Sequence, residues 1–259
     1  LGQPGSGKTT FALQWLEEVS KNGSAALFYS LDMGQPIVYG KLVQKVLGCS
    51  FRELMEILKN NPEKLQEAHE KIKVNFANVQ FNFKSSVTTD MIKEDVRNYE
   101  QTTGKKVRLL IVDYLECLAG SSSDPLVNAA QISQQMKDIA NEFNLCSVML
   151  LQTQKHSTPD ISDPLLSMKK IKGSSVIEQS SSVILTLWRE GYNPKNVQED
   201  NFLSFAVVKN RFGSLWTDDC AWNGKKGIIS DLPDEGRTLL EQLREKKKQQ
   251  AAASNAQWE

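Results

Sequence analysis

The first residues of the chain have the spacing of a loop that binds phosphate groups. Residues 2–9 read GQPGSGKT, which matches the pattern GxxxxGK[ST] at every defined position. Glycines in such a loop let the backbone wrap a phosphate with its N–H groups pointing inward, and the dipole of the following helix adds positive potential. We therefore predict a nucleoside triphosphate site. Its loop and flank comprise Gly2, Gln3, Pro4, Gly5, Ser6, Gly7, Lys8, Thr9 and Thr10.

Two oxygen ligands for a magnesium ion are expected beside this loop. The ammonium of Lys8 should reach the β- and γ-phosphates, while the hydroxyl of Thr9 should ligate Mg²⁺. A second ligand is expected from a carboxylate at the end of a buried strand, and residues 109–113 read LLIVD. The alternative for Asp113 is a simple strand-end cap, but the loop upstream favours metal binding. We expect ATP and Mg²⁺ as cofactors, held by Lys8, Thr9 and Asp113.

Two further polar residues stand at the ends of predicted strands. Asp32 follows the apolar run 25–31, and Gln152 ends the run 146–152. In parallel sheets, ligands bind at the carboxyl edge where such residues gather. Asp32 is a candidate for orienting the attacking water; the alternative is a helix N-cap. Gln152 is a candidate sensor of the γ-phosphate; the alternative is a strand-end side chain bonded to a loop.

The elements that must position these residues alternate between strands and helices. Such alternation after a phosphate-binding loop predicts an α/β fold with a mostly parallel central sheet and helices on both faces. A buried strand normally precedes such a loop, so we expect that strand to lie upstream of Leu1. We predict one ATPase domain over residues 1–233 and a charged helix with a tail over residues 234–259. The predicted strands are residues 25–31, 79–83, 107–114, 146–152, 183–188 and 202–208.

Composition excludes several classes of protein. The 259 residues carry 31 Lys+Arg and 31 Asp+Glu, so any site for a polyanion must come from local clustering of charge. The four scattered cysteines favour reduced thiols over disulfides or zinc. No apolar run reaches the roughly 18–20 residues of a membrane span. We expect a cytoplasmic protein without membrane contact, with a mitochondrial matrix or phage origin as the open alternatives.

Five segments resemble one family in its own order: SLDM at 30–33, IVDYL at 111–115, LLQ at 150–152, VIEQ at 176–179 and KNRFG at 209–213. They are similar to motifs of the DnaB-type hexameric replicative helicases and related phage primase-helicases. The resemblance spans residue 1 to about residue 220. It implies a RecA-like fold.

The resemblance also implies roles for individual residues. Asp32 stands where the family generally has a catalytic glutamate, and Gln152 matches the glutamine that senses the γ-phosphate. Lys209 and Arg211 match a pair that reaches the nucleotide of the neighbouring subunit, with Arg211 as an arginine finger. Such fingers contribute about 10³–10⁵ in rate. Without the resemblance, Lys209 and Arg211 read as a solvated strand end.

The family places loops that bind DNA in the channel of a ring. Residues 153–173 precede the Glu-Gln pair as that loop should, and basic loops around a ring would follow the phosphates of a single strand. The alternative is a solvated surface loop. The chain has three serines at 180–182, where family members often have acidic residues. The candidate DNA-binding residues are Lys155, Lys169, Lys170, Lys172, Glu178 and Gln179.

These features favour an ATP-hydrolysing ring motor that translocates on single-stranded DNA and unwinds duplex DNA in replication. The expected assembly is a homohexamer, with a primase or a helicase loader as a further partner. One alternative is a RecA-like recombinase or recombination mediator that uses ATP to hold a filament. Another is a regulatory ATPase ring that binds protein rather than DNA.

Overall fold

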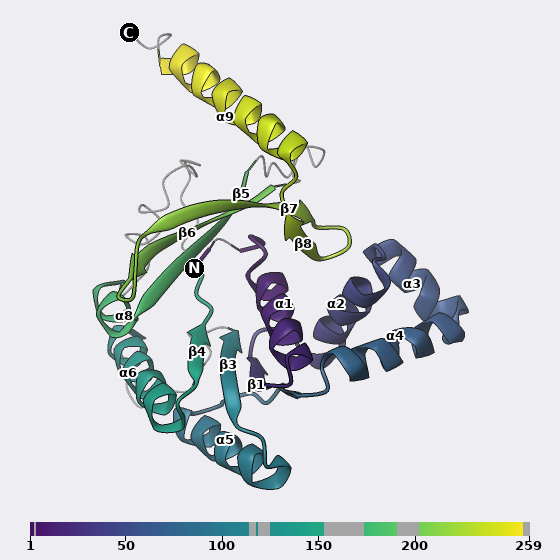
Figure 1. Cartoon of the computed structure of the whole chain (residues 1–259), viewed down its shortest axis with the longest axis vertical. Coiled ribbons are helices and arrows are strands. Elements are labelled where there is room, and N and C mark those ends of the chain that lie inside the picture. Colours follow the sequence, from purple (N-terminus) through teal and green to yellow (C-terminus); the bar gives the residue numbers. More distant parts are fainter. Residues whose placement is uncertain (3, 114–117, 119–124, 153–173, 191–201, 256–259) are drawn as a thin grey trace.

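The computed structural model describes residues 1–2, 4–113, 118, 125–152, 174–190 and 202–255. Two four-stranded sheets and their flanking helices make up the part of the chain that the structure describes (Figure 1). The first sheet is parallel, in the order β2-β1-β3-β4; the second is antiparallel, in the order β5-β6-β7-β8. The strands are β1 (Ala25–Ser30), β2 (Val79–Asn82), β3 (Val107–Asp113), β4 (Cys146–Met149), β5 (Val183–Glu190), β6 (Phe202–Asn210), β7 (Trp216–Asn223) and β8 (Ile228–Asp231).

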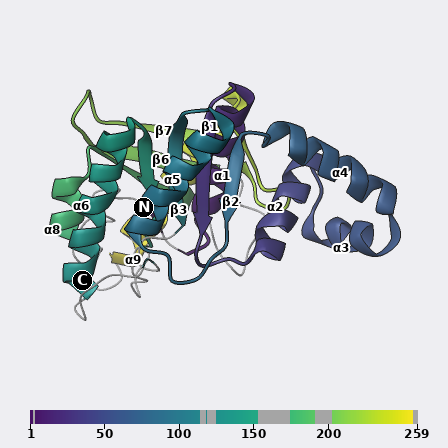
Figure 2. The same ribbon diagram turned by 90° about the horizontal axis from the view of Figure 1, so that it is seen from below.

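Helices cover both faces of the parallel sheet, as predicted (Figures 1 and 2). Alternate residues of β1 point to opposite faces: Leu27 packs with residues of α5 and α6, and Phe28 packs with residues of α1 and α2. All six β1 residues are buried, which explains the uninterrupted apolar run. The helices are α1 (Lys8–Lys21), α2 (Gln35–Leu47), α3 (Phe51–Asn60), α4 (Pro62–Asn75), α5 (Thr89–Thr103), α6 (Pro125–Phe143), α8 (Ser174–Ser180) and α9 (Asp234–Asn255).

Local signals in the sequence set several helix ends. The Ser50 hydroxyl and the Glu53 carboxylate form a reciprocal capping box at the start of α3. The side chain of Asn61 accepts from the Lys64 N–H where α4 begins at Pro62. Together, α2, α3 and α4 extend to one side of the sheet and share a small core around Leu54 (Figure 2).

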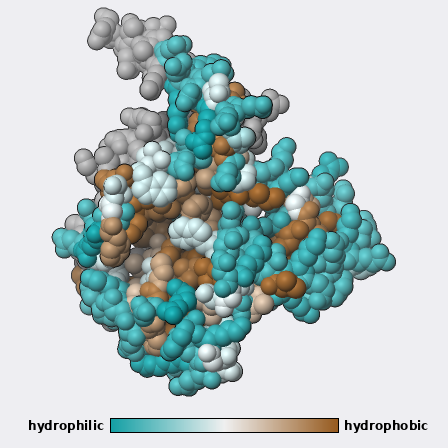
Figure 3. Space-filling model, viewed as in Figure 1, coloured by the Kyte–Doolittle hydropathy of each residue, from teal (hydrophilic) through white to brown (hydrophobic). Residues whose placement is uncertain are grey.

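The antiparallel sheet contains two predicted strands and two that were not predicted. The predicted strands are β5 and β6, whereas the pair β7 and β8 was not predicted. Gly2 forms isolated bridges with Gln152 on one side and Leu187 on the other, so the start of the loop connects the two sheets. A cavity of about 700 Å³ lies beside it, lined mainly by apolar residues of β4, β5, α1 and α6. Figure 3 shows apolar residues in a hollow at this place.

The last helix, α9, begins at Asp234, the first residue of the predicted C-terminal segment. Its first half is attached to the antiparallel sheet, where Leu240 packs against Phe202 and Arg244 pairs with Asp219 at 2.8 Å. The rest of the helix projects away from the body (Figure 1). The division at residue 234 stays a prediction. None of the helices within the described ranges is long and apolar enough to cross a membrane.

Candidate nucleotide-binding site

The phosphate-binding loop leads directly into the first turn of α1. Gly7 is the N-cap residue of α1, with φ 95° and ψ 9°, and has no side chain to cap the helix. The first N–H groups of α1 are therefore available to an anion. The side chain of Lys8 is buried, and its Nζ donates to the carbonyl of Gly2 at 2.8 Å. Gln3 lies outside the described residues.

The two predicted metal ligands are in direct contact. The Thr9 hydroxyl donates to Oδ2 of Asp113 at 2.7 Å, which joins residues 104 positions apart. Burial raises the pKa of the Asp113 carboxyl, and its hydrogen bond from Thr9 and the nearby ammonium of Lys8 only partly oppose this rise. A buried carboxylate of this kind gains from a cation beside it.

Sheet pairing brings a second carboxylate to the same edge. Ser30, the last residue of β1, is the register partner of Asp113, and the Leu31 N–H donates to the Asp113 carbonyl at 2.7 Å. The Ser30 hydroxyl donates to the carbonyl of Met33, which closes the turn that carries Asp32. Asp32 is exposed and faces the same cavity as Asp113.

A cavity of about 350 Å³ collects most of the predicted residues of the site. Ser6 of the loop is buried, and its hydroxyl has no hydrogen-bond partner within the described chain. The predicted part of the cavity is thus built from the loop, the end of β3 and the segments that follow β1 and β4. The predicted residues that line it are Pro4, Gly5, Gly7, Lys8, Thr9, Thr10, Asp32, Asp113 and Gln152.

The donor set fits a magnesium ion. Mg²⁺ prefers oxygen ligands and binds ATP enzymes through one or two protein oxygens plus phosphates and water. A hydroxyl and a buried carboxylate in contact inside a phosphate-binding cavity supply that set. Thr9 and Asp113 are therefore the residues that would hold the ion.

Comparison with known proteins identifies the family of the chain that carries these site residues. The sequence pattern of the DnaB-like helicase C terminal domain matches residues 1–230. The chain belongs to this family. It is 29% identical over 232 residues to the "Probable replicative DNA helicase" of Trieres chinensis, a match that covers 83% of this chain and 49% of that protein. The chain spans about half the length of the curated relatives it matches.

Solved structures show the same fold. The structure titled "ATPase Domain of G40P" superposes with a TM-score of 0.79 at 22% identity, covering 90% of this chain and 83% of that chain. A structure of a DnaB-like replicative helicase, whose title mentions its interactions with primase, also has a TM-score of 0.79 at 22% identity, covering 90% of this chain and 57% of that one. The RecA-like fold expected from the sequence is confirmed.

The two residues that match the family's finger pair lie away from the cavity of their own chain. Lys209 and Arg211, at the end of β6, face the last turn of α8 instead. The Lys209 ammonium donates to the carbonyl of Glu178, and the Arg211 guanidinium donates to that of Gln179 at 2.7 Å. Hydroxyls of Ser180 and Ser181 donate to the carbonyl of Ile177. Three successive carbonyls at the C-terminus of α8 are thereby capped by side chains.

The candidate DNA-binding residues fall into two groups. Glu178 and Gln179 lie exposed on α8. The four basic candidates lie outside the described residues, so their role stays a prediction. These are Lys155, Lys169, Lys170 and Lys172.

Sequence reasoning missed one side of the cavity, which α2 and the turn between β7 and β8 provide. Burial lowers the pKa of Lys41, although the nearby carboxylate of Asp113 opposes this shift. Lys45 pairs with Glu17 of α1 at 2.9 Å, which ties α2 to the helix that follows the loop. Helical spacing puts Lys41 and Lys45 on one face of α2, but only the fold shows which face. The missed lining residues are Leu13, Met33, Lys41, Gln44, Lys45, Trp222, Gly224 and Gly227.

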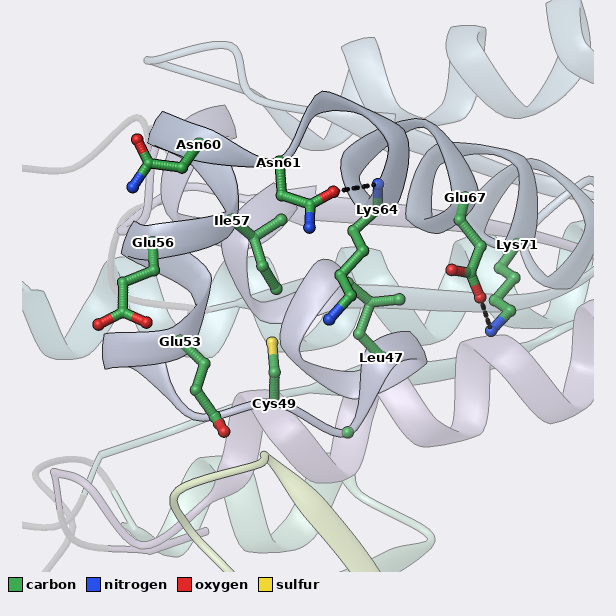
Figure 4. Close-up of a pocket in the computed structure, with 11 residues that line it drawn as sticks. Leu47, Cys49, Glu53, Glu56, Ile57, Asn60, Asn61, Lys64, Glu67 and Lys71 are labelled. Carbon is green, nitrogen blue, oxygen red and sulfur yellow. Dashed lines mark hydrogen bonds and ion pairs between the residues drawn. The ribbon is translucent and has the colours of Figure 1, made fainter.

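A larger cavity, of about 780 Å³, lies between α2, α3 and α4 (Figure 4). Its wall mixes carboxylates with lysines, and two of these, Glu67 and Lys71, pair with each other at 2.7 Å. None of the phosphate-binding residues lines it. This cavity therefore does not compete with the loop as the nucleotide site.

Replacing Gly7 with alanine is expected to weaken nucleotide binding and to lower the free energy of unfolding. The φ of 95° is strained for any residue with a β-carbon, at a cost of about 1–3 kcal/mol. A methyl group at Gly7 would also lie 3.0 Å from the ring of Trp222. Urea denaturation and titration with a fluorescent ATP analogue measure the two effects.

Gly23→Ala is the matched control for this substitution. Gly23 also has a positive φ, of 79°, but an added methyl group there meets nothing within 4 Å. Both variants should lose stability, and only Gly7→Ala should lose affinity for the nucleotide. Equal affinities in the two variants would contradict the assignment of Gly7 to the site.

Proposed function

We propose that this chain is the ATP-hydrolysing motor domain of a replicative DNA helicase that works as a ring of identical subunits. The proposal rests on one observation: the nucleotide site of a single chain is incomplete. The cavity joins phosphate-binding, metal-binding and water-orienting groups, yet no arginine is among the described residues that line it. The arginine of the family's finger motif, Arg211, lies elsewhere on the same chain. A neighbouring subunit would complete the site.

Each residue has a defined task in this proposal. The loop N–H groups and Lys8 bind the phosphates, and Asp32 holds the attacking water by accepting its proton. Thr9 and Asp113 would hold magnesium, which would supply positive charge to neutralise the phosphates. Gln152, at the strand end beside Gly2, contacts the γ-phosphate. Asp32 is one methylene shorter than the glutamate usual in the family, so its carboxylate stands further from the water.

The work on DNA is assigned to the segment that leads into α8. Residues 153–173 carry the four basic candidates, and Glu178 and Gln179 follow on the helix. Repeated around a ring, such loops would bind the backbone of single-stranded DNA without reading its sequence. We place a primase or a helicase loader among the partners, and the site of action in the cytoplasm, the mitochondrial matrix or a phage-infected cell.

The ATPase rate with and without single-stranded DNA tests this function, on protein whose assembly has been sized by light scattering. Closed hexamers, stimulation by single-stranded DNA and displacement of a labelled strand are the expected results. Open filaments that pair strands would instead indicate a recombinase. Turnover that DNA leaves unchanged, without binding of a labelled single strand at low salt, would indicate a ring that acts on protein.

A further inference from the structure

One face of α2 brings three polar side chains into the nucleotide cavity. Lys41, Gln44 and Lys45 all line it. Their spacing of three and four residues puts them on the same side of the helix. The buried Val38 precedes them by one turn and packs into the core that α2 shares with α1 and the parallel sheet. This packing fixes which side of α2 faces the nucleotide site.

Two of these three side chains have partners of their own. The Gln44 amide donates to the carbonyl of Lys225 at 3.1 Å, and Lys45 pairs with the buried carboxylate of Glu17 at 2.9 Å. Lys41 is partly buried, yet it forms neither an ion pair nor a hydrogen bond with any other residue in the described ranges. A cation held out of water without an anion costs free energy. Lys41 would therefore gain from a negatively charged ligand.

Neighbouring charges place the Lys41 ammonium at the metal-binding end of the cavity. Burial lowers the pKa of Lys41, and the carboxylate of Asp113 opposes that shift, so the two charges are close. Asp113 takes its hydrogen bond from Thr9 at 2.7 Å rather than from Lys41. Asp32, on the turn that leads into α2, lines the same cavity and acts on the pKa of Asp113 as well. In an ATP site, the γ-phosphate lies between the metal ligands and the group that orients the water.

We propose that Lys41 binds the γ-phosphate of ATP in the cavity of its own chain, with its ammonium donating to a phosphate oxygen. ADP has no γ-phosphate and leaves this ammonium without an anion. Lys41 thereby favours ATP over ADP. Positive charge would then reach the γ-phosphate from two sides, from Lys41 of the same chain and from Arg211 of the neighbouring subunit. This inference rests on the proposed function, because it takes the cavity to be an ATP site.

Lys41→Met tests the inference, because methionine keeps an unbranched apolar side chain and removes the charge. Dissociation constants for a non-hydrolysable ATP analogue and for ADP, both with Mg²⁺, are measured by calorimetry. The affinity for the ATP analogue should fall about tenfold, the effect of losing one hydrogen bond to a charged group. The affinity for ADP should stay unchanged.

Two further variants separate the γ-phosphate contact from a general effect of charge. Lys41→Arg keeps a cation on this face of α2 and should keep most of the preference for the ATP analogue over ADP. Lys45→Met removes a charge one turn further along the same face. Because Glu17 already neutralises Lys45, this change should leave the ratio of the two affinities as in wild type.

Several outcomes would overturn the inference. Equal weakening of both nucleotides in Lys41→Met would mean that Lys41 only supports the cavity, for example by balancing the charge of Asp113. Unchanged affinities would mean that Lys41 contacts no phosphate. A wild-type chain that binds neither nucleotide would refute the ATP site, and this inference with it. An ATP preference that depends on Lys41 would support the inference even in a chain whose turnover ignores DNA.

A second measurement needs no variant at position 41. Wild-type protein is treated briefly with acetic anhydride, and acetylation of individual lysines is followed by mass spectrometry. The ATP analogue should slow acetylation of Lys41, whereas ADP should not. Lys8 is the internal reference, because both nucleotides should protect it through the phosphates that they share. Equal protection of Lys41 by the two nucleotides would refute the γ-phosphate contact, whether or not the Lys41→Met chain folds.

Discussion

Rings of Arg211→Ala subunits are expected to hydrolyse ATP about a thousandfold more slowly than wild-type rings, the lower end of the effect of an arginine finger. The guanidinium would stabilise charge on the transferring phosphoryl group of the neighbouring subunit, and a methyl group cannot. Binding of ATP to each subunit's own loop should persist, because Arg211 does not line that cavity. Steady-state turnover and equilibrium binding measure the two quantities separately.

Mixing two kinds of subunit shows whether Arg211 acts on the nucleotide site of its own subunit or on that of its neighbour. A Lys8→Ala subunit lacks its own phosphate contact but offers an intact Arg211, so rings mixed with Arg211→Ala subunits should regain part of the ATPase activity. No recovery in mixed rings would contradict action between subunits. Arg237→Ala is the matched control, because Arg237 is an exposed arginine at 4.0 Å from a carboxylate oxygen of Asp218 and does not line the cavity. It should leave turnover unchanged.

Asp113→Asn should reduce magnesium-dependent hydrolysis by about two to three orders of magnitude, the cost of removing one preorganised electrostatic contact. The amide keeps the shape of the side chain and can still pair with Thr9. It lacks the charge that would hold the metal ion. ATPase assays over a range of Mg²⁺ concentrations should show that added metal does not restore the rate. Asp138→Asn, an exposed change on α6, serves as the control.

The same substitution should not destabilise the protein at neutral pH when metal is absent. Burial raises the folded-state pKa of Asp113 above its ordinary value of 3.8. A raised carboxyl pKa contributes stability that is complete below 3.8 and lost as pH rises through the folded-state pKa. The carboxyl therefore contributes less stability at pH 7 than at low pH, and the asparagine variant, which does not ionise, should resist urea at pH 7 at least as well as wild type. A clear loss of stability at pH 7 would contradict this.

The loop, its lysine and the strand-end carboxylates could be predicted because their signals are local. A glycine-rich turn that opens a helix has few other structural meanings, and together with it an apolar run that ends in aspartate favours a metal ligand over a strand-end cap. Parallel pairing then brings Asp32 and Asp113 to one edge, which the predicted parallel direction of the strands is enough to indicate. The strands begin at the predicted residues but end elsewhere, mostly by one or two residues. The largest change is in β4, which ends at Met149 rather than at residue 152, while Gln152 keeps its place through a bridge to Gly2.

The pair β7 and β8 could not be predicted because its stability depends on distant partners. β7 reads WTDDCAWN, and its two aspartates resemble a loop. In the fold, Asp219 accepts hydrogen bonds from Ser204 of β6 and from Arg244 of α9. These contacts depend on tertiary structure, which overrides the weak strand propensity of aspartate. The position of Trp222 beside the loop was missed for the same reason.

Pairing between β1 and β3 also limits how the site can change during turnover. Both strands are buried between two cores, and sliding by one residue would turn every side chain of β1 to the wrong core. The backbone position of Asp113 relative to Ser30 is therefore as rigid as the sheet itself. Differences between nucleotide states must arise around this fixed reference, in side-chain rotations, in the turn after β1 and in the approach of a neighbouring subunit. In the proposed motor, the carboxylate that would hold the metal ion is therefore the stationary part.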